Sequence, residues 1–469
     1  MTLFCPYRRL KWRGPRLGTL TVTLALLALS GCTTIAPGFR AEHAREFQAS
    51  LDARTEEALP PGTVLGLDEC LKLAMAHNLD LRAQRLAVDM ARLDESIAFS
   101  AFLPQVTASA SVTSWDRQPA SQMLGPVTIP THDKTLRDVS YDVQMPIAVP
   151  ATWLLYSIRG HGASSAEYGL DYARQMIALN VTSAYYECLA LMASRDALRT
   201  QLDHVRVFAR ELNELYGEGL VAAWQWEQAK TAAMARQTAL QETERSLQQR
   251  KGSLLHLLGL SPLTDVSLQV DAPLEMPSEA LPDLVYGALR NHPRLHVADR
   301  DVAIAEDEVK ISIMAFLPNL AGFASFANTS ESRSQYKWSS LGGFASFMTL
   351  FNGFANVHDY RNAKGKAEKA YIEREAQCIA LMAEVQAAYL NTQTAGDYLA
   401  VADQALAAAE AHLKEVEARV AEGLLLGSDH LQVLAERDEA QSQRAAALFR
   451  HQLSIAVLLN TLGGTYAGS

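Results

Sequence analysis

Side chains that could do chemistry are present in this sequence, but they are not arranged as catalytic or metal-binding motifs. The 469 residues contain no HExxH, GxSxG or P-loop motif, and no GxGxxG motif between a predicted strand and a helix. Twelve histidines are scattered along the chain, and His161, in the segment RGHGASS, has no sequence neighbour that would complete a site. Cys70, Cys188 and Cys378 are far apart and lack CxxC spacing, so we expect small core residues rather than disulfides or zinc ligands. The sequence therefore predicts no catalytic residues, no metal site, no cofactor and no enzyme activity.

The sequence around Cys32 predicts that the thiol of this cysteine is chemically modified. Residues 1–31 begin with a basic stretch without acidic residues, continue with the apolar run LTVTLALLAL and end with Leu29-Ser30-Gly31 before Cys32. This order of basic, apolar and small residues is typical of a signal peptide. The apolar run is also too short for a helix that crosses a bilayer comfortably. The Leu29–Cys32 segment resembles the lipobox of bacterial lipoproteins, which implies that the Cys32 thiol carries acyl chains; an ordinary signal peptide containing a cysteine is the alternative. An Asp directly after Cys32 would resemble an inner-membrane retention signal. The residue there is Thr33, so the resemblance implies that the protein is delivered to the outer membrane.

The rest of the chain is acidic. Its formal charge is −10 overall and −15 without residues 1–31, which argues against binding to nucleic acid. A hydrophobic share of 49% is enough to form a core.

The chain contains two copies of one unit. The string AFLP occurs at Ala101–Pro104 and again at Ala315–Pro318, and Leu67–Ser111 aligns with Leu281–Ser325 without a gap at an offset of 214. After these strings the best offset is 204, where VTSAYYE meets VQAAYLN and YGEGL meets VAEGL. Self-similarity at such a long period indicates duplication rather than a solenoid. We expect a signal peptide at 1–31, a mature N-terminal segment at 32–66, repeats at 67–262 and 281–464, a linker at 263–280 and a tail at 465–469.

Each repeat is predicted to contain long helices. No proline interrupts residues 163–216, so a helix of about 50 residues is expected there, roughly 75 Å long. Apolar residues in both copies follow a spacing of three and four, which indicates a packing seam of the coiled-coil type; a plain helical bundle would show the same spacing. The seam residues are Leu198, Leu202, Val205, Ala209, Leu212 and Tyr216 in copy one, and Leu399, Ala402, Leu406, Ala409, Leu413, Val416 and Val420 in copy two.

Amphipathic strands are predicted after each AFLP string. Pro104 and Pro318 should end the preceding helices. Apolar and polar residues then alternate, less regularly in copy two than in copy one, with strands expected at about 104–113, 138–148, 318–327 and 338–350. Their length of about ten residues suits a tilted strand in a membrane. Residues 114–134 are expected to be a long loop, and Arg159–Ser165 a polar exit from strand to helix.

Four strands in one chain cannot close into a barrel. Open strand edges are not tolerated in lipid, so strands that span a membrane here require several chains to share one barrel. Two chains would supply eight strands and a filled interior, whereas three would supply twelve and leave room for water.

The duplicated FLP, the paired long helices, the paired EGL segments and the lipobox together resemble the TolC-like outer-membrane efflux proteins, in their lipid-anchored branch. The resemblance covers nearly all of Leu67–Gly464. It implies a mainly α fold with a small membrane β part, in which long helical hairpins form a trimeric α-barrel and four strands per chain join a shared 12-stranded β-barrel. It further implies a passive exit duct in the outer membrane that extends into the periplasm and works with a periplasmic adaptor and an inner-membrane pump. The alternative is a coiled-coil periplasmic lipoprotein scaffold without a pore.

The EGL segments interrupt the helical patterns with glycine and are expected to reverse the helices, at about 217–226 and 423–432. By the resemblance they form the periplasmic tip, where the adaptor binds, with Gly217, Gly219, Leu220, Gly423 and Leu424 as contacts. The family places an acidic residue six positions after a tip glycine. Copy two has it, from Gly423 to Asp429, but copy one has Gln225 there.

Three copies of Asp429 around one axis would form a periplasmic gate that attracts cations. The alternative is that Asp429 stabilises the start of the returning helix.

Trp224 and Trp226, beside the first tip, are expected to pack between helices, with adaptor binding as the alternative.

Overall fold

The structure is a computed structural model that describes residues 39–60, 62–117, 121–124, 127–130, 132–270, 273–422 and 427–464. Cys32, the predicted signal peptide, Gly423, Leu424 and the predicted tail lie outside the described residues. Met1–Pro61 and Gly62–Ser469 are separate units. The first unit contains helix α2, Phe39–Ala58, in which the Thr55 hydroxyl donates to the carbonyl oxygen of Leu51 at 2.7 Å.

The second unit consists of two sets of helices with nearly equal lengths. The first set is α3 (Leu67–His77), α4 (Leu79–Ser100), α5 (Pro150–Gly217) and α6 (Ala223–Leu257), with 11, 22, 68 and 35 residues. The second set is α7 (Leu281–Asn291), α8 (Pro293–Met314), α9 (Ala355–Ala421) and α10 (Gly427–Thr461), with 11, 22, 67 and 35 residues. The duplication read from the sequence is therefore confirmed in three dimensions.

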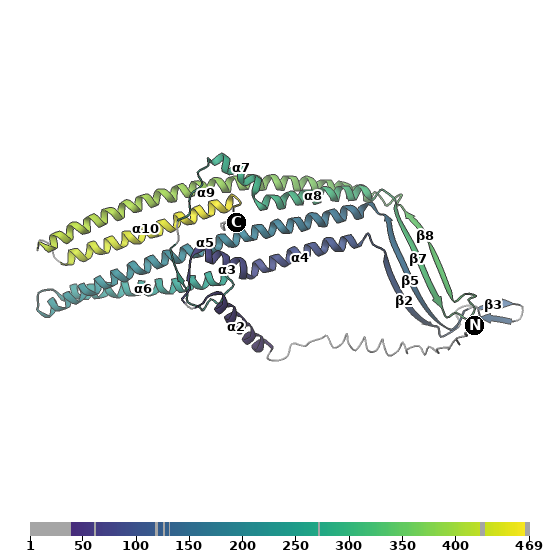
Figure 1. Cartoon of the computed structure of the whole chain (residues 1–469), viewed down its shortest axis with the longest axis horizontal. Helices are drawn as coiled ribbons and strands as arrows, with labels where there is room; N and C mark the ends of the chain where they lie inside the picture. The colour runs from purple at the N-terminus through teal and green to yellow at the C-terminus, as the bar shows by residue number, and fades with distance from the viewer. Residues whose placement is uncertain are drawn as a thin grey trace, which may run out of the picture. The chain divides into compact units, whose positions relative to one another are not determined.

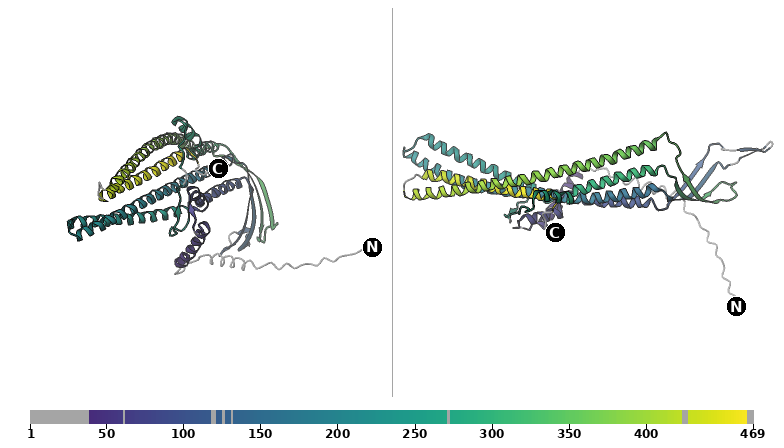
Figure 2. Two further views of the ribbon diagram at one scale, coloured as in Figure 1. Left: turned by 60° about the vertical axis from the view of Figure 1, so that its left-hand side comes forward. Right: turned by 90° about the horizontal axis from the view of Figure 1, so that it is seen from above.

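The helices form one layer in which each long helix faces different neighbours along its length (Figures 1 and 2). In the half nearer the strands the order is α4, α5, α8, α9, and in the far half it is α6, α5, α10, α9. Long helices α5 and α9 run through both halves and hold them together. Among the described residues, α4 and α6 lie at one edge of this layer and α9 lies at the other, where α7 also packs on it.

The predicted heptad seams lie where the helices pack. In copy two Leu413 and Val416 of α9 form a buried cluster with Val433 of α10. Every seam residue is buried or half-buried except Tyr216, which lies at the end of α5 and is exposed. Apolar spacing of three and four therefore identified the packed side of both helices.

A pair of related junctions joins the two shorter helices of each repeat, α3 to α4 and α7 to α8. Asn78 begins α4, and its Oδ1 accepts from the Leu81 amide at 2.9 Å. The equivalent His292 begins α8, and its Nδ1 accepts from the Arg294 amide at 3.2 Å. Burial lowers the pKa of His292, which keeps the ring neutral and able to accept. Gly259 packs on the first junction with φ +72°, and a Cβ there would lie 2.2 Å from the His77 carbonyl oxygen.

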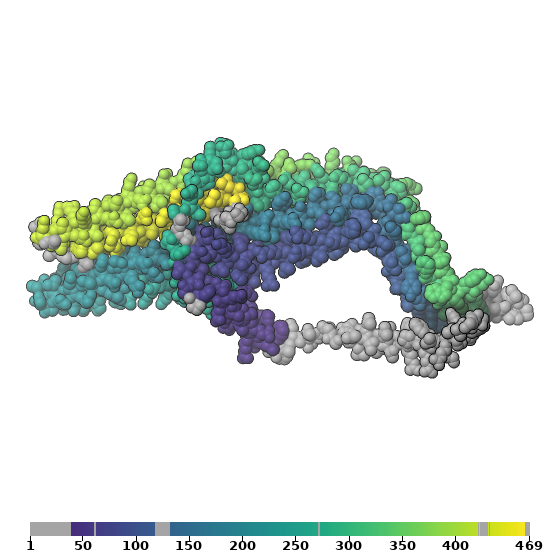
Figure 3. Space-filling view, viewed as in Figure 1, coloured from purple at the N-terminus to yellow at the C-terminus, as the bar shows by residue number. Residues whose placement is uncertain are grey.

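The strands form a four-stranded antiparallel sheet. Its members are β2 (Gln105–Ser114), β5 (Thr135–Ala148), β7 (Asn319–Thr329) and β8 (Trp338–Phe347), in the order β2-β5-β7-β8. This order matches that of α4, α5, α8 and α9, to which the strands connect. Figure 3 shows the sheet bending away from the helices. The four strands expected from the sequence are therefore present, and the sheet continues the helical layer.

The structure corrects two predictions. Residues 114–134, expected to be a loop, contain a hairpin of β3 (Ser121–Leu124) and β4 (Val127–Pro130). Arg159–Ser165, expected to be an exit from strand to helix, lies inside α5, which already begins at Pro150. Helix α5 continues through Gly160 and Gly162 because it packs against α4 and α8. A separate parallel pair, β1 (Val64–Leu65) with β6 (Ser267–Leu268), ties the linker to the start of repeat one.

Candidate functional site

The two faces of the sheet differ in chemistry. Residues directly opposite each other on neighbouring strands share a face, and side chains alternate along each strand. One face carries Val106, Val112, Tyr141, Phe326, Trp338 and Phe344, and the other carries Thr107, Ser109, Ser140, Asp142, Gln144 and Ser325. In β7 and β8 this second face also carries Phe323, Leu341 and Phe347, so the polar character comes mainly from β2 and β5. An apolar face opposite a polar face is the pattern of a membrane barrel strand, which contacts lipid outside and water inside.

The sheet is open at both edges. Strand β2 pairs only with β5, and β8 pairs only with β7, within the described part of the chain. Along each edge a row of backbone N–H and C=O groups points away from the sheet. In lipid each such group costs several kcal/mol if it has no partner. A four-stranded sheet in a membrane is therefore incomplete.

Exposed apolar residues lie along the helix that continues β2. Leu86, Met90, Leu93 and Ile97 on α4 are each more than half exposed and are spaced four, three and four residues apart. This is the spacing of a coiled-coil seam, but α4 packs only on α5 among the long helices described. Sequence reasoning missed this stripe, although the same heptad test would have found it. On α9 a second set of large apolar residues is exposed, consisting of Ile372, Ile379, Met382, Leu390, Tyr398 and Val401.

The tip of repeat one is a tight turn with exposed apolar residues. Helix α5 ends at Gly217, and Gly219 adopts φ +74°, a conformation that favours glycine, before α6 begins at Ala223. Leu220 and Trp224 are 67% and 66% exposed. The packing prediction is therefore wrong for Trp224 within one chain. It is confirmed for Trp226, whose ring stacks on Tyr216 with centroids 5.7 Å apart.

The second tip is described only in part. Helix α9 ends at Ala421 and α10 begins at Gly427, so Asp429 is the third residue of α10. An acidic residue in the first turn of a helix is stabilised by the helix dipole. The backbone position is compatible with both roles predicted for Asp429.

His161 does have a partner, supplied by the other repeat. Asp307 of α8 is 3% exposed, and its Oδ2 lies 3.9 Å from His161 Nε2 on α5. Lys310 donates to the other oxygen of Asp307 at 2.7 Å. Among the residues described, no group of three or more His, Cys, Asp or Glu side chains could hold a metal ion. The pair therefore forms a polar contact between the two repeats.

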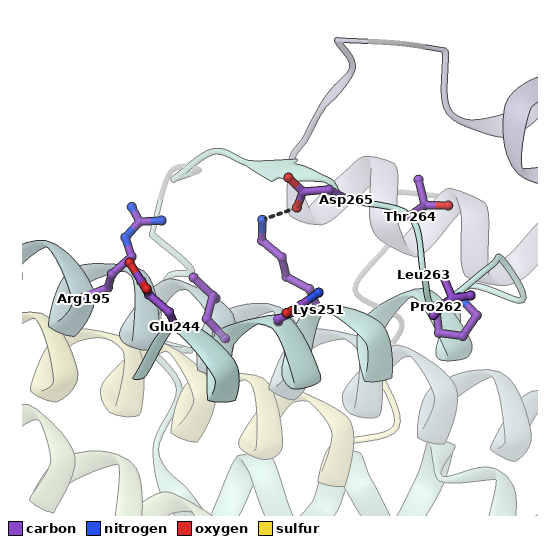
Figure 4. A pocket seen from close by; sticks show the side chains of 9 residues that line it. Arg195, Glu244, Lys251, Pro262, Leu263, Thr264 and Asp265 are labelled. Carbon is purple, nitrogen blue, oxygen red and sulfur yellow. Dashed lines mark hydrogen bonds and ion pairs between the residues drawn. The ribbon is translucent and has the colours of Figure 1, made fainter. Parts of the chain in front are cut away.

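A surface pocket of about 360 Å³ lies between α6 and the segment that follows it (Figure 4). Lys251 of α6 donates to Asp265 at 2.9 Å, and this hydrogen bond lowers the pKa of the Asp265 carboxyl. Leu263, on the same segment, is 90% exposed. The pocket is lined by the residues that attach this segment to α6, and it contains no catalytic arrangement.

The loops at the ends of the strands farthest from the helices are clasped together. Glu331 accepts from the Asp133 amide at 3.0 Å, and Asp133 accepts from the Ser332 amide and hydroxyl at 2.5 and 2.6 Å. His132 lies 3.2 Å from Glu331 through its Nδ1. Each carboxylate thus binds the backbone of the other repeat, across 198 or 199 residues of sequence. We call Asp133, Glu331 and Ser332 the outer clasp.

Comparisons with known proteins assign the chain to a family. The profile of the family described as "Outer membrane efflux protein" matches residues 70–260 and 284–464. The comparison with curated proteins finds no match. Among solved structures, the outer membrane protein VceC from Vibrio cholerae is 18% identical, with 85% of this chain and 96% of that chain covered and a TM-score of 0.70. The CmeC outer membrane channel of Campylobacter jejuni is 17% identical, with 85% of each chain covered and a TM-score of 0.74. The MtrE outer membrane channel of Neisseria gonorrhoeae is 15% identical, with 85% and 89% covered and a TM-score of 0.68.

The chain belongs to the outer membrane efflux protein family, since the profile matches most of its length in two separate blocks. These blocks lie within the two repeats, and the solved structures share the fold. The protein is an efflux channel of the outer membrane with a long extension into the periplasm. A scaffold without a pore is not favoured.

The outer clasp makes a prediction about pH. The hydrogen bonds from Ser332 hold the pKa of Asp133 below its usual value. A lowered pKa in the folded state stabilises the clasp above the unfolded pKa of about 4, and this stabilisation is lost as pH falls through the folded value. We expect Asp133→Asn to lower hydrogen-exchange protection at the Ser332 amide at pH 7, and wild type to lose the same protection once the pH falls through the lowered pKa of Asp133. Asp116→Asn is the matched control, because within the described part of the chain Asp116 accepts its hydrogen bond from the adjacent Arg117 amide. Equal protection in all three proteins at pH 7 would show that the clasp is absent.

Proposed function

We propose that three copies of this chain form the lipid-anchored exit duct of a tripartite efflux system, which passively conducts substrates that an adaptor and an inner-membrane pump deliver. The observation that carries the proposal is the open sheet, whose order is continued by the helical layer. Three chains of four strands would give a closed twelve-stranded barrel with a water-filled interior. Two chains would give eight strands, whose side chains would fill the interior.

The helices support the same assembly. The apolar stripe of α4 continues from the β2 edge, and the exposed apolar residues of α9 continue from the β8 edge. When β2 of one copy pairs with β8 of the next, α4 approaches α9 of that copy. Burying one Leu or Met side chain is worth about 1.5–3 kcal/mol, so a stripe of this size stabilises the contact. The open strand edges and the exposed apolar helix residues therefore both favour contact with the same neighbouring copy.

We expect Leu93→Glu to prevent assembly, because a carboxylate in the middle of the α4 stripe would be buried without a partner. Size-exclusion chromatography with light scattering, on detergent-extracted protein, should show loss of the trimer. Leu263→Glu introduces the same charge at a position that is 90% exposed and off the stripe, and should leave the trimer intact. A stable Leu93→Glu trimer would mean that α4 does not form the interface.

The tips are proposed as the periplasmic end, where the adaptor binds and the channel narrows. Exposed Leu220 and Trp224 lie at the turn formed by Gly217 and Gly219. A large aromatic side chain beside small turn residues is suited to anchor a partner protein. Gly423 and Leu424 occupy the equivalent position in sequence and complete the proposed contact.

Asp429 is proposed as the gate residue, because a threefold axis at the tip would bring three copies of it close together. Three carboxylates at one constriction attract cations and resist anions. We expect Asp429→Ala and Asp429→Asn to keep trimers intact but to change conductance or block by divalent cations in planar bilayers. A role limited to helix capping would instead leave both channel properties unchanged and lower the melting temperature of Asp429→Ala more than that of Asp429→Asn.

Cys32 is proposed as the lipid-attachment site that holds the channel at the membrane surface. A thiol directly after Leu29-Ser30-Gly31 is the motif that supports it. Mass spectrometry of the mature protein should find a first residue at Cys32 that carries acyl chains. Cys32→Ser should lack this added mass. A wild-type protein that begins elsewhere, or that has an unmodified thiol, would refute the anchor.

A further inference from the structure

The polar face of the sheet carries charge of one sign only. In the described strands β2, β5, β7 and β8, the charged residues are Arg137, Asp138 and Asp142. Asp138 lies opposite Ser111 and Thr329, and Asp142 lies opposite Thr107 and Ser325, which places both carboxylates on the polar face. Arg137 lies opposite Val112, on the apolar face. The polar face therefore has two acidic residues and no basic residue along these strands.

Asp142 is held in place by neutral groups. Its Oδ2 accepts from the Ser140 hydroxyl at 2.7 Å, and its Oδ1 accepts from the Ser325 hydroxyl at 2.6 Å. Ser109 lies 2.8 Å from Ser140, hydroxyl to hydroxyl, so that the network crosses β2, β5 and β7. Hydroxyl donors favour the ionised carboxylate without cancelling its charge. The side chain is thus fixed on the wall with its negative charge intact.

The basic residues nearest to this face in sequence lie beyond the strand ends. Lys134 and Lys337 belong to the outer loops, and the ammonium group of Lys337 donates to the carbonyl oxygen of Glu331. The outer clasp adds two carboxylates at the same end, beside the basic side chains of Arg333 and Lys337. Lys337 pairs through its backbone with Thr329, which lies opposite Asp138, so it offsets part of the field of Asp138. No cation on the described strands β2, β5, β7 and β8 offsets the field of Asp142 on the polar face.

We propose that Asp138 and Asp142 make the membrane barrel selective for cations, and that the cargo it passes most readily carries positive charge. This rests on the proposed trimer, in which the polar face lines the lumen and the two residues become six carboxylates. A single sign of charge in a confined, water-filled space raises the local concentration of counter-ions. The effect comes from the field of the wall, which extends about 10 Å at 0.1 M salt, and requires no bound ion.

The test is the reversal potential of single channels in planar bilayers under a KCl gradient. The Asp429→Asn background removes the charge proposed at the tip, so that the wall is measured alone. We expect this channel to prefer K⁺ over Cl⁻, and expect adding Asp138→Asn and Asp142→Asn to reduce the permeability ratio at least twofold. Raising KCl towards 1 M should also reduce the ratio of the background channel, because the screening length falls to about 3 Å.

Arg137→Gln is the matched control, since it removes a charge from the residue next to Asp138 but on the apolar face. It should leave the permeability ratio unchanged. A double Asp variant that conducts with unaltered selectivity would overturn the inference while leaving the channel intact. An Arg137→Gln effect as large as that of the double variant would also overturn it. Absence of any conductance in wild type would instead count against the proposed function.

Discussion

The unpaired backbone at the two edges of the sheet is the constraint on which the rest of this structure depends. Water can satisfy an exposed strand edge, but hydrocarbon cannot, and each group left without a partner costs several kcal/mol. Strands β2 and β8 are edges in the described chain, while their apolar face suits lipid. A chain with this sheet can enter a membrane only if further strands complete both edges. Assembly and membrane insertion are therefore one requirement.

The duplication explains why the helices are arranged in the same order as the strands of the sheet. Each repeat supplies one hairpin of strands and one set of helices of matching length, so strand order and helix order agree across the layer. Related junctions at Asn78 and His292 begin α4 and α8, the helices that pack on the long helices in the half nearer the strands. The repeats also differ in single residues. Asp429 and Asp142 each come from one repeat alone.

Much of this architecture could be predicted from local sequence. Pro104 and Pro318 end helices because proline cannot continue the backbone hydrogen-bond pattern, and the alternating residues after Pro104 have one polar face. Heptad spacing also identified the packed seams of α5 and α9, because residues three and four positions apart lie on the same side of a helix. These features depend on neighbours a few residues away, which a sequence shows directly.

Other features depend on contacts between distant segments and left no local signal. Gly160 and Gly162 lie inside α5 because packing on neighbouring helices outweighs their low helix propensity. The outer clasp joins Asp133 to Ser332, and Asp307 reaches His161, only after the repeats come together. Of the predicted site residues, Cys32, Gly423 and Leu424 lie outside the described residues and remain predictions. Gly217 and Gly219 form the expected turn, while the roles of Leu220 and Asp429 depend on partners that one chain does not contain.

The central claim is that β2 of one copy pairs with β8 of the next. It can be tested by disulfide cross-linking of Ala108→Cys in β2 with Ser340→Cys, Gly342→Cys or Phe344→Cys in β8, one pair at a time, in membranes. These positions share the apolar face but lie at opposite edges of the sheet. The account predicts that at least one pair yields a covalent ladder that ends at three chains, while each single variant yields none. Cross-linking confined within one chain, or a ladder that ends at two, would contradict it.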